Sequence, residues 1–578
     1  ETVPMEPEGR GYFSVLAGGF KPGSRYFYLL NGEVVRPDPA SRSQPQGVNG
    51  PSEIINPRAF TWQDQSWKGL PQEALIIYEI HIGTFTPSGT FEGVIPLLDI
   101  LKGELGITAL ELMPVAQFSG NRNWGYDGTY LYAPQNSYGG PRGLKTLINA
   151  CHQRGLAVIL DVVYNHLGPE GNYLGEYGPY FTDRYKTPWG PAINFDGPQS
   201  DEIRRFFIDN ALYWITEYHL DGLRLDAVHG IFDFGSCHIL GELRQAVRRQ
   251  AEKLGRTVVI FAECNLNNPR ILDPPEIGGY GLDAQWNDDF HHSLHTLLTK
   301  EDRGYYQDFG KMDQLAKALQ DGYVYSGQYS NFRQKRHGSS SCHLPSSKFV
   351  VFSQNHDQVG NRIKGERLSV LTSYEGLKLA AGIVLLSPGI PLLFMGEEYG
   401  EKAPFYYFIS HEDESLVEAV RRSRREEFLN NAFVGEEPPD PQSQSTFLQC
   451  KLNWGLLREE THAALRNYYR YLIGLRKEFP APAPPGKADL EISLSPDHSW
   501  MAMQRHLPIK DYLCLFNFSK TPSAIPLLID TGDWLRVLDS SSLTWRGPGS
   551  LSAKIFRGAS APVCCHVNAQ SLVVYKKG

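Results

Sequence analysis

Eight short apolar segments alternate with segments of helical periodicity from about residue 72 onward, and this alternation limits the possible folds more than any other feature of the sequence. In one intervening segment, apolar residues fall at positions 203, 207, 211, 214, 215 and 218, the spacing of one helix face. Apolar strands with amphipathic crossovers predict a parallel sheet buried on both faces. Eight such units predict an α/β fold of the (β/α)8 TIM-barrel type. The predicted strands are 76–82, 108–113, 157–163, 222–226, 258–263, 282–286, 349–354 and 390–395.

Three of the predicted strands deliver an acid at their C-terminal end. The fourth strand ends at Asp226, the fifth ends at Glu263, and the seventh is followed directly by Asn355-His356-Asp357. In barrels of this type, catalytic groups come from the C-terminal ends of several different strands. We therefore expect the three carboxylates to converge at the mouth of the barrel.

Arg224 lies two residues before Asp226 in the fourth strand. Successive side chains of a strand point to opposite faces, so residues 224 and 226 should point the same way. A guanidinium beside a carboxylate keeps the acid ionised at neutral pH, which suits a nucleophile. A purely structural Arg–Asp pair explains this stretch equally well when it is taken alone.

The three acids together fit glycoside hydrolysis with retention of configuration. That reaction needs a carboxylate nucleophile and a carboxylic acid about 5–5.5 Å apart. We expect Asp226 to be the nucleophile and Glu263 the proton donor, since burial beside another acid should raise the pKa of Glu263. Asp357 would then hold sugar hydroxyls and stabilise positive charge as the ring flattens.

His166 and His356 follow strand ends, where they could bind hydroxyl groups, although one such histidine alone would more often be structural. Tyr126 offers a flat face for a sugar ring, and a lone aromatic would more often belong to the core. The sequence contains no glycine-rich phosphate loop followed by lysine and no thiolate–histidine metal cluster. A sugar is therefore the expected substrate, with no cofactor and no metal.

Smaller β-rich segments flank the predicted barrel. We expect an N-terminal β-sandwich over residues 1–70, which we interpret as incomplete, and the catalytic barrel over 71–484. A long stretch at 164–199 is rich in Gly, Pro and aromatic residues and should fold over the mouth. The proline-rich connector 479–485 leads to a C-terminal antiparallel β-sandwich over 485–578.

Charge and composition exclude several classes of partner. The net charge of −8 provides no basic face for nucleic acid. No run of about 20 apolar residues is present, so we expect no membrane span, and no signal peptide is visible. The eight cysteines show no paired framework, which favours thiols in a reducing cytoplasm.

The segments 161–166, 222–229, 262–263 and 355–357 resemble, in order and spacing, the four signature regions of the α-amylase family of glycoside hydrolases. A narrower set looks like one family within it, the malto-oligosyltrehalose trehalohydrolases. That set is 180–190, 193–198, 266–270, 283–292, 354–362 and 404–408.

The resemblance implies cleavage of the α-1,4 bond beside a terminal trehalose unit of malto-oligosyltrehalose. It also implies functional pairing with a malto-oligosyltrehalose synthase. By motif, it gives Asp226 the role of nucleophile, Glu263 that of proton donor and Asp357 that of transition-state stabiliser. The residues implied to bind substrate are Arg224, His229, Asp288, His291, His292, His356, Gln358 and Asn361, in addition to the candidates Tyr126 and His166 given above. The resemblance places Asp288, His291 and His292 on a short loop after the sixth strand, on the leaving-group side.

Two alternatives remain open at this stage. A related α-glucan debranching or branching enzyme shares the covalent intermediate and differs only in the hydroxyl that resolves it. A catalytically inactive barrel that binds sugar is a rival of another class. The presence of all three carboxylates argues against the inactive barrel.

Overall fold

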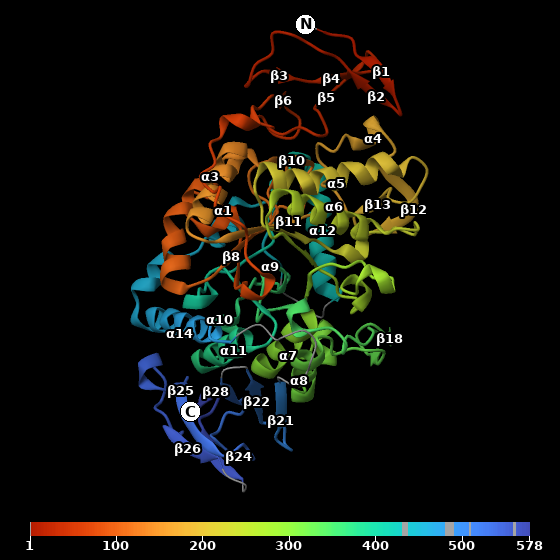
Figure 1. Ribbon diagram of the computed structural model, residues 1–578. Helices are drawn as coiled ribbons and strands as arrows, with labels where there is room; N and C mark the ends of the chain where they lie inside the picture. The colour runs from red at the N-terminus through yellow and green to blue at the C-terminus, as the bar shows by residue number, and fades with distance from the viewer. Residues whose placement is uncertain (1, 431–436, 480–489, 508–509, 559–561) are drawn as a thin grey trace.

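The computed structural model of the chain describes residues 2–430, 437–479, 490–507, 510–558 and 562–578. Its centre is a closed barrel of eight parallel strands, each hydrogen-bonded to the next in chain order and the last to the first (Figure 1). All eight predicted strands are present, each within its predicted range, and the predicted TIM barrel is confirmed. The strands are β7 Ile77–Ile80, β8 Ala109–Leu112, β11 Ala157–Val162, β14 Gly222–Leu225, β15 Val259–Ala262, β16 Ala284–Trp286, β19 Phe349–Val351 and β20 Ile390–Phe394.

Helices surround the barrel and bury the outward faces of its strands. In α5 (Ser200–Glu217), the side chains of Ile203, Phe207, Trp214 and Ile215 are all buried, so this helix turns its predicted apolar face inward. The other long helices of this layer are α3 Gly140–Gln153, α6 Ile239–Leu254, α7 Asp288–Thr299, α8 Met312–Asp321, α11 Tyr374–Leu386 and α14 Glu460–Arg476.

The interior of the barrel has a separate apolar core. Ile77, Ile159, Phe261 and Val350, from four different strands, form one buried cluster there. This packing keeps the strand ends in fixed positions, so side chains at the C-terminal ends are held on a rigid support.

Several segments extend from the C-terminal ends of the strands. After β8 comes the antiparallel pair β9 (Ala116–Gln117) and β10 (Tyr130–Pro134). After β11 come α4 (Leu174–Tyr177) and the antiparallel pair β12 (Phe181–Thr187) and β13 (Gly190–Ile193). The last three elements lie within the long stretch that the sequence analysis placed over the mouth.

The C-terminal part forms two antiparallel sheets, and the predicted antiparallel β-rich end is confirmed. The larger sheet has the strand order β21-β22-β23-β28-β25-β26, and the smaller one pairs β24 with β27. Trp500 and Leu515 of the large sheet share one buried cluster with Ile525 and Val567 of the small sheet. The strands are β21 Leu490–Leu494, β22 Trp500–His506, β23 Asp511–Asn517, β24 Ser523–Leu527, β25 Gly532–Asp539, β26 Ile555–Gly558, β27 Val563–Val567 and β28 Ser571–Lys577.

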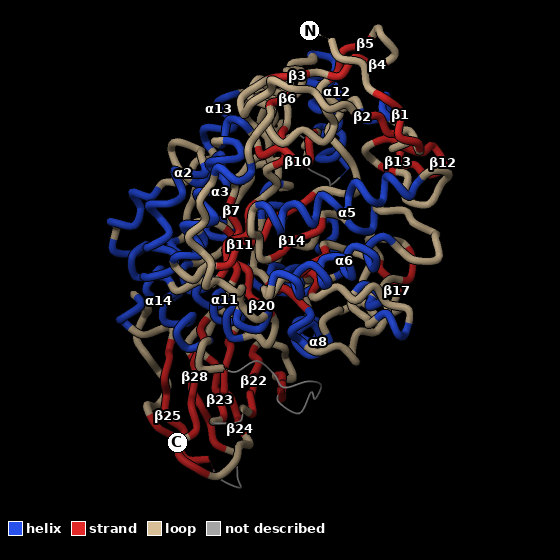
Figure 2. The backbone as a smooth tube through the Cα atoms, turned by 45° about the horizontal axis from the view of Figure 1, so that its top comes forward, coloured by secondary structure: helices blue, strands red, loops and turns tan. Residues whose placement is uncertain are grey.

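The N-terminal part consists of short antiparallel pairs, β1–β2, β3–β6 and β4–β5. They lie at the opposite end of the molecule from the C-terminal sheets in both views (Figures 1 and 2). An incomplete sandwich at this end stays a prediction. The predicted connector 479–485 lies, apart from Phe479, outside the described residues. The strands are β1 Glu6–Gly9, β2 Tyr12–Ser14, β3 Arg25–Tyr26, β4 Tyr28–Leu30, β5 Val34–Arg36 and β6 Ser52–Glu53.

Two local predictions need correction. Asp357 lies in the first turn of a short helix, α9 (His356–Gly360), rather than at a strand end, because β19 already ends at Val351. Residues 288–292 begin helix α7 rather than forming a loop, since Asn287 caps that helix by accepting a hydrogen bond from the backbone N–H of Phe290. Within the described residues, no helix has the length and apolar character needed to cross a membrane.

Candidate active site

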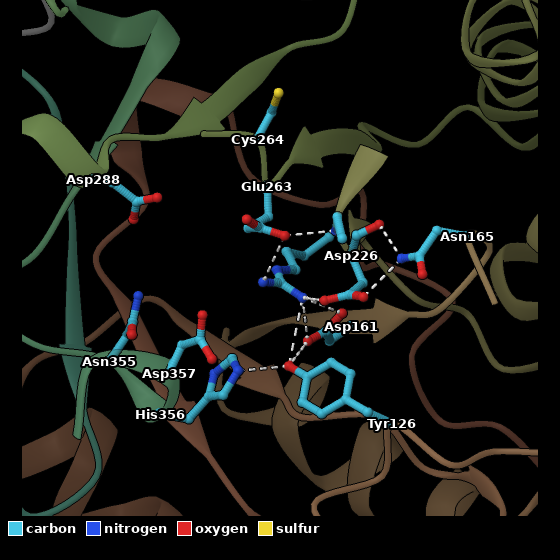
Figure 3. A network of polar contacts seen from close by, with 12 residues as sticks. Tyr126, Asp161, Asn165, Asp226, Glu263, Cys264, Asp288, Asn355, His356 and Asp357 are labelled. Atoms are coloured by element: carbon cyan, nitrogen blue, oxygen red, sulfur yellow. Dashed lines mark hydrogen bonds and ion pairs between the residues drawn. The ribbon is translucent and has the colours of Figure 1, made fainter. Parts of the chain in front are cut away.

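The fourth and fifth barrel strands place Asp226 and Glu263 side by side. The backbone N–H of Glu263 donates to the carbonyl of Leu225 at 2.9 Å, which extends the pairing of β14 and β15 to the residues that carry the acids. Figure 3 shows these two acids on one side of the site, with Asp288 and Asp357 on the other. The four carboxyl groups therefore come from four successive strand ends or the turns that follow them.

Arg224 is the centre of a network of hydrogen bonds and ion pairs with three acids. Its Nη1 donates to Asp226 Oδ1 at 2.8 Å and to both oxygens of Asp161 at 2.8 and 2.9 Å. Its Nη2 lies 3.8 Å from Glu263 Oε2. The guanidinium stacks over the Trp286 ring at 4.3 Å and is fully buried, so its position is fixed. The predicted pairing of Arg224 with Asp226 is confirmed.

The surroundings of Asp226 favour its ionised form. Burial alone would raise its pKa, but the charges of Arg224 and His166 and a hydrogen bond from Asn165 outweigh burial, and the pKa is lowered. Asn165 Nδ2 donates at 2.7 Å to Asp226 Oδ2 and at 2.8 Å to the carbonyl of the same residue. This side chain is therefore an oriented carboxylate at neutral pH, as a nucleophile must be.

Glu263 has the opposite electrostatic character. Burial raises its pKa well above the ordinary value, and the carboxylates of Asp226, Asp288 and Asp357 add to that effect, although Arg224 opposes it. An acid that keeps its proton at neutral pH is suited to proton donation. The two acids thus have pKa values moved in opposite directions while both contact one guanidinium.

The backbone after Asp226 contributes to this arrangement. Ala227 has a φ of 37°, in the left-handed region that residues other than glycine rarely adopt. In that conformation its N–H donates to Glu263 Oε2 at 2.6 Å. Strained residues of this kind cost about 1–3 kcal/mol and occur mainly at functional sites. Here the strained residue fixes the carboxyl group of Glu263 against the strand that carries Asp226.

His356 and Tyr126 form a second part of the network. Tyr126 Oη donates to Asp161 Oδ2 at 2.6 Å and lies 2.7 Å from His356 Nε2. Although burial favours neutral His356, Glu79 raises the pKa of this histidine. The tyrosine has one proton, which it gives to Asp161, so His356 donates to the tyrosine oxygen. The hydroxyl of Tyr126 and both ring nitrogens of His356 are therefore occupied by protein partners.

Asp288, Gln358 and Asn361 gather around Asp357. Asn361 Nδ2 donates to Asp357 Oδ1 at 2.8 Å, and Gln358 Nε2 donates to Asp288 Oδ1 at 3.3 Å. Burial, followed by the nearby charge of Asp357, raises the pKa of Asp288 to about 7. The structure therefore brings together all four of these sequence-predicted residues.

His166 and His229 differ in the hydrogen-bond partners of their ring nitrogens. His166 stacks on half-exposed Trp189, with 4.4 Å between ring centroids, and its Nε2 lies 3.0 Å from the carbonyl of Tyr126. Among the described residues, Nδ1 of His229 has no hydrogen-bond partner. This nitrogen is thus a buried polar atom without a protein partner in the part of the chain described.

His291 and His292 lie near the start of helix α7, and both are buried. His291 is 1% exposed, and its ring nitrogens lie 2.8 Å from the carbonyl of Ser353 and 3.0 Å from the hydroxyl of Tyr306. His292 is 8% exposed and packs against Tyr305 and other aromatic rings. Burial lowers the pKa of His291 well below its usual range and that of His292 to about 3. The two protein partners of His291 fit a supporting role for that residue better than direct contact with a sugar.

Sequence reasoning missed several groups that hold the site together, namely Asp161, Asn165, Glu79 and Trp286. The first lies in β11 directly opposite Arg224 in the strand register. Acids inside otherwise apolar strands were the available signal, because a charged group in a buried strand must have a partner. Within the described residues, no group of three or more His, Cys, Asp or Glu side chains is arranged to hold a metal ion.

Comparisons with known proteins agree with this geometry. Residues 41–187 match the family model described as the catalytic domain of α-amylase. A malto-oligosyltrehalose trehalohydrolase from Saccharolobus solfataricus is 52% identical over 82% of this chain and 81% of its own length. One from Mycobacterium tuberculosis is 42% identical over 87% of each chain.

Solved structures support the same fold. A crystal structure from Salmonella typhimurium, provisionally described as an α-amylase, has a TM-score of 0.89 and 38% identity and covers 99% of this chain and 94% of its own. A pullulanase from Bacillus acidopullulyticus has a TM-score of 0.71 at 19% identity and covers 99% of this chain and 70% of its own, which supports the fold alone.

Proposed function

The chain belongs to the malto-oligosyltrehalose trehalohydrolase family, and we propose that it hydrolyses the α-1,4-glucosidic bond beside the terminal trehalose unit of malto-oligosyltrehalose, releasing trehalose. The observation that carries the chemistry is the pair Asp226 and Glu263, which share Arg224 while their pKa values are moved in opposite directions. Family membership supports the choice of substrate.

In the first step, the Asp226 carboxylate attacks the anomeric carbon as the bond to the leaving trehalose oxygen breaks. Glu263 gives its proton to that oxygen, so trehalose leaves as a neutral alcohol. The product is a glycosyl ester on Asp226, and Glu263 is left as a carboxylate.

In the second step, water attacks the same carbon from the vacated side. Glu263 takes a proton from the water, the ester bond to Asp226 breaks, and both acids return to their starting states. Asp357 stabilises the positive charge that develops on the sugar ring in both transition states. Two inversions leave the product with the configuration of the substrate.

Asn165 and Arg224 support the nucleophile through these steps. They hold both oxygens of Asp226 before substrate arrives, so little reorganisation is needed as the ester forms. We propose that His229, Asp288, Gln358 and Asn361 meet sugar hydroxyls around this centre. The polar atoms of Tyr126, His166 and His356 have protein partners, so we propose that these three residues contact the sugar through their rings. His291 and His292 are proposed to act indirectly, because protein partners surround their rings.

We also propose that the chain works in the cytoplasm alongside a malto-oligosyltrehalose synthase. Its substrate carries a terminal trehalose unit, so an enzyme that rearranges the reducing end of a maltodextrin must act first. The eight cysteines are free, which suits a reducing compartment. Debranching or branching of α-glucan is not favoured, because the pullulanases are 17–21% identical and a branching enzyme 25% identical, whereas the trehalohydrolases are 41–52% identical.

The test incubates the enzyme with maltotriosyl-trehalose and, separately, with maltopentaose, and identifies the products. A trehalose unit has no reducing end and bends at its α,α-1,1 bond, so polar groups matched to it would be left unpaired by maltose. We expect kcat/KM for maltotriosyl-trehalose to exceed that for maltopentaose by at least about 10-fold, or roughly 1.4 kcal/mol.

The Asp226→Asn variant, purified in parallel, controls for contaminating glucanases and should release no trehalose. Equal kcat/KM values for the two substrates would contradict the trehalohydrolase assignment and would indicate a general α-glucan hydrolase. The barrel and the roles of the three carboxylates would stand in that case.

A further inference from the structure

Helix α12 (Glu414–Asn430) brings Arg424 to the edge of the site from a segment far along the chain. Its Nη1 donates to Asn361 Oδ1 at 3.1 Å, and its Nη2 donates to the carbonyl of Gly360 at 3.2 Å. Both acceptors belong to the C-terminal end of α9, the helix whose first turn carries Asp357. We propose that Arg424 is a positioning residue for Asp357 and acts through Asn361.

The argument rests first on hydrogen-bond chemistry. An arginine side chain can only donate, whereas an ionised carboxylate can only accept. Asn361 lies between the two, so its amide has one orientation that satisfies both neighbours. Its oxygen faces Arg424, and its Nδ2 faces Asp357 Oδ1 at 2.8 Å. Without the guanidinium, the amide oxygen loses this donor, and the amide is held from the Asp357 side alone.

The second observation concerns the end of helix α9. The last carbonyl groups of a helix have no partners within it, and a cation at that end is favourable. Arg424 supplies both the donor and the charge at Gly360. Because α9 has five residues, fixing its C-terminal end also fixes its first turn, which carries Asp357.

The guanidinium of Arg424 packs against an aromatic ring. It lies 4.9 Å above the centre of the Tyr407 ring, and that ring packs edge-on against Trp124 with 5.1 Å between centroids. Trp124 Nε1 donates to the carbonyl of Tyr406 at 2.8 Å, which ties this aromatic support to the loop after β20. Arg424 is thus seated on a rigid aromatic surface while its donors reach α9.

The inference depends on the proposed role of Asp357 in the reaction. If Asp357 stabilises charge in the transition state, its orientation affects the rate of the chemical step more than substrate binding. Loss of Arg424 should therefore appear mainly in kcat. A residue that only bound a sugar hydroxyl would appear mainly in KM.

The experiment measures kcat and KM on maltotriosyl-trehalose for the full chain and for Arg424→Met, Arg424→Lys and Arg421→Met. Arg421 is the matched control, because it lies one turn earlier on α12 and pairs with Asp440 at 2.7 Å. Hydrogen bonds that involve a charged group correspond to about a 10- to 100-fold effect on rate. We expect Arg424→Met to lower kcat by that factor and KM to change by less than about 3-fold.

Arg424→Lys keeps a cation that can donate to Asn361 and should recover a large part of the lost kcat. Arg421→Met should keep the kcat of the original chain. A double-mutant cycle adds Asn361→Leu. Adding Arg424→Met to Asn361→Leu should lower kcat by a smaller factor than Arg424→Met lowers it in the original chain, because only the contact with Gly360 is then left to lose. Independent losses that multiply in the double variant would overturn the inference. So would an equal fall in kcat for the Arg421 and Arg424 variants.

Asp357→Asn separates this inference from the proposed function. Normal kcat in Asp357→Asn would overturn the assigned role of Asp357 and the inference with it. An inactive Asp357→Asn together with an Arg424→Met variant of normal kcat would overturn the inference alone.

Discussion

Replacing Asn165 by alanine removes the donor that holds the candidate nucleophile. Asn165 is 2% exposed, and its Nδ2 bonds both a side-chain oxygen and the carbonyl of Asp226, at 2.7 and 2.8 Å. A hydrogen bond to a charged group contributes about 1.5–3 kcal/mol, and a neutral one about 1 kcal/mol. We therefore expect Asn165→Ala to lower the free energy of unfolding by about 2.5–4 kcal/mol at pH 7.

The pH dependence of that loss has a definite sign. Asp226 has a lowered pKa in the folded chain, so its contribution to stability is present above the unfolded value of about 3.9 and is lost as the pH falls through the folded pKa. Without Asn165 that pKa rises toward the ordinary range. The stability difference between the two chains should therefore shrink as the pH falls below about 4.

The assays are denaturant unfolding and kcat/KM measured across pH. The acid limb of kcat/KM should move to higher pH in Asn165→Ala, because the nucleophile must be ionised to react. Asn267→Ala is the matched control, since Asn267 Nδ2 donates at 2.7 Å to another buried carboxylate, that of Asp289. It also lies at a φ of 52°, so alanine there adds strain and should cost at least as much stability. An acid limb that stays in place in Asn165→Ala, or that moves equally in Asn267→Ala, would refute the reasoning.

Two further predictions follow from the raised and lowered pKa values. Glu263→Gln should remove the alkaline limb of the kcat/KM profile, because that limb reports loss of the proton that Glu263 donates. The variant should also cleave natural substrates far more slowly, whereas its rate on an activated aryl glycoside should fall much less. An equal loss of rate on both substrates would argue against Glu263 as the acid. At the other end of the barrel, the His152 ring nitrogens lie 2.8 Å from Asp64 Oδ2 and 2.9 Å from Asp221 Oδ2. Hydrogen bonds to these two carboxylates outweigh the effect of burial and raise the pKa of His152, whereas hydrogen bonds from histidine lower the pKa of Asp64. The stability contributed by this cluster should be full between about pH 4 and 6.5 and should decline at lower and at higher pH. The difference in thermal midpoint between the original chain and Asp64→Asn should therefore be largest in that range. A difference that does not depend on pH would contradict this expectation.

The sequence was sufficient to predict the barrel and the core of the site, because both depend on local patterns. Strand alternation alone places Arg224 and Asp226 on one face, and the structure has them 2.8 Å apart. The apolar run that ends in Glu263 likewise indicated a buried acid with a raised pKa. These features follow from the period of a strand and from burial.

Contacts between distant segments could not be predicted in this way. Asn165 reaches Asp226 across 61 positions, and Arg424 reaches Asn361 across 63, so their partners depend on how the loops fold. The expectation that His291 contacts the sugar also depended on how a distant segment folds. Helix α7 begins at Asp288, which turns residue 291 inward toward Ser353 and Tyr306.

The central claim is that Asp226 forms a covalent bond to the sugar, and trapping the intermediate tests it most directly. In the Glu263→Gln variant, α-maltosyl fluoride can still glycosylate the enzyme because fluoride needs little acid assistance, whereas hydrolysis lacks its base. After quenching and peptic digestion, mass spectrometry should find a maltosyl group on the peptide that contains Asp226. A maltosyl group on Asp357 or another carboxylate, or fluoride release with no adduct at any time, would contradict the account.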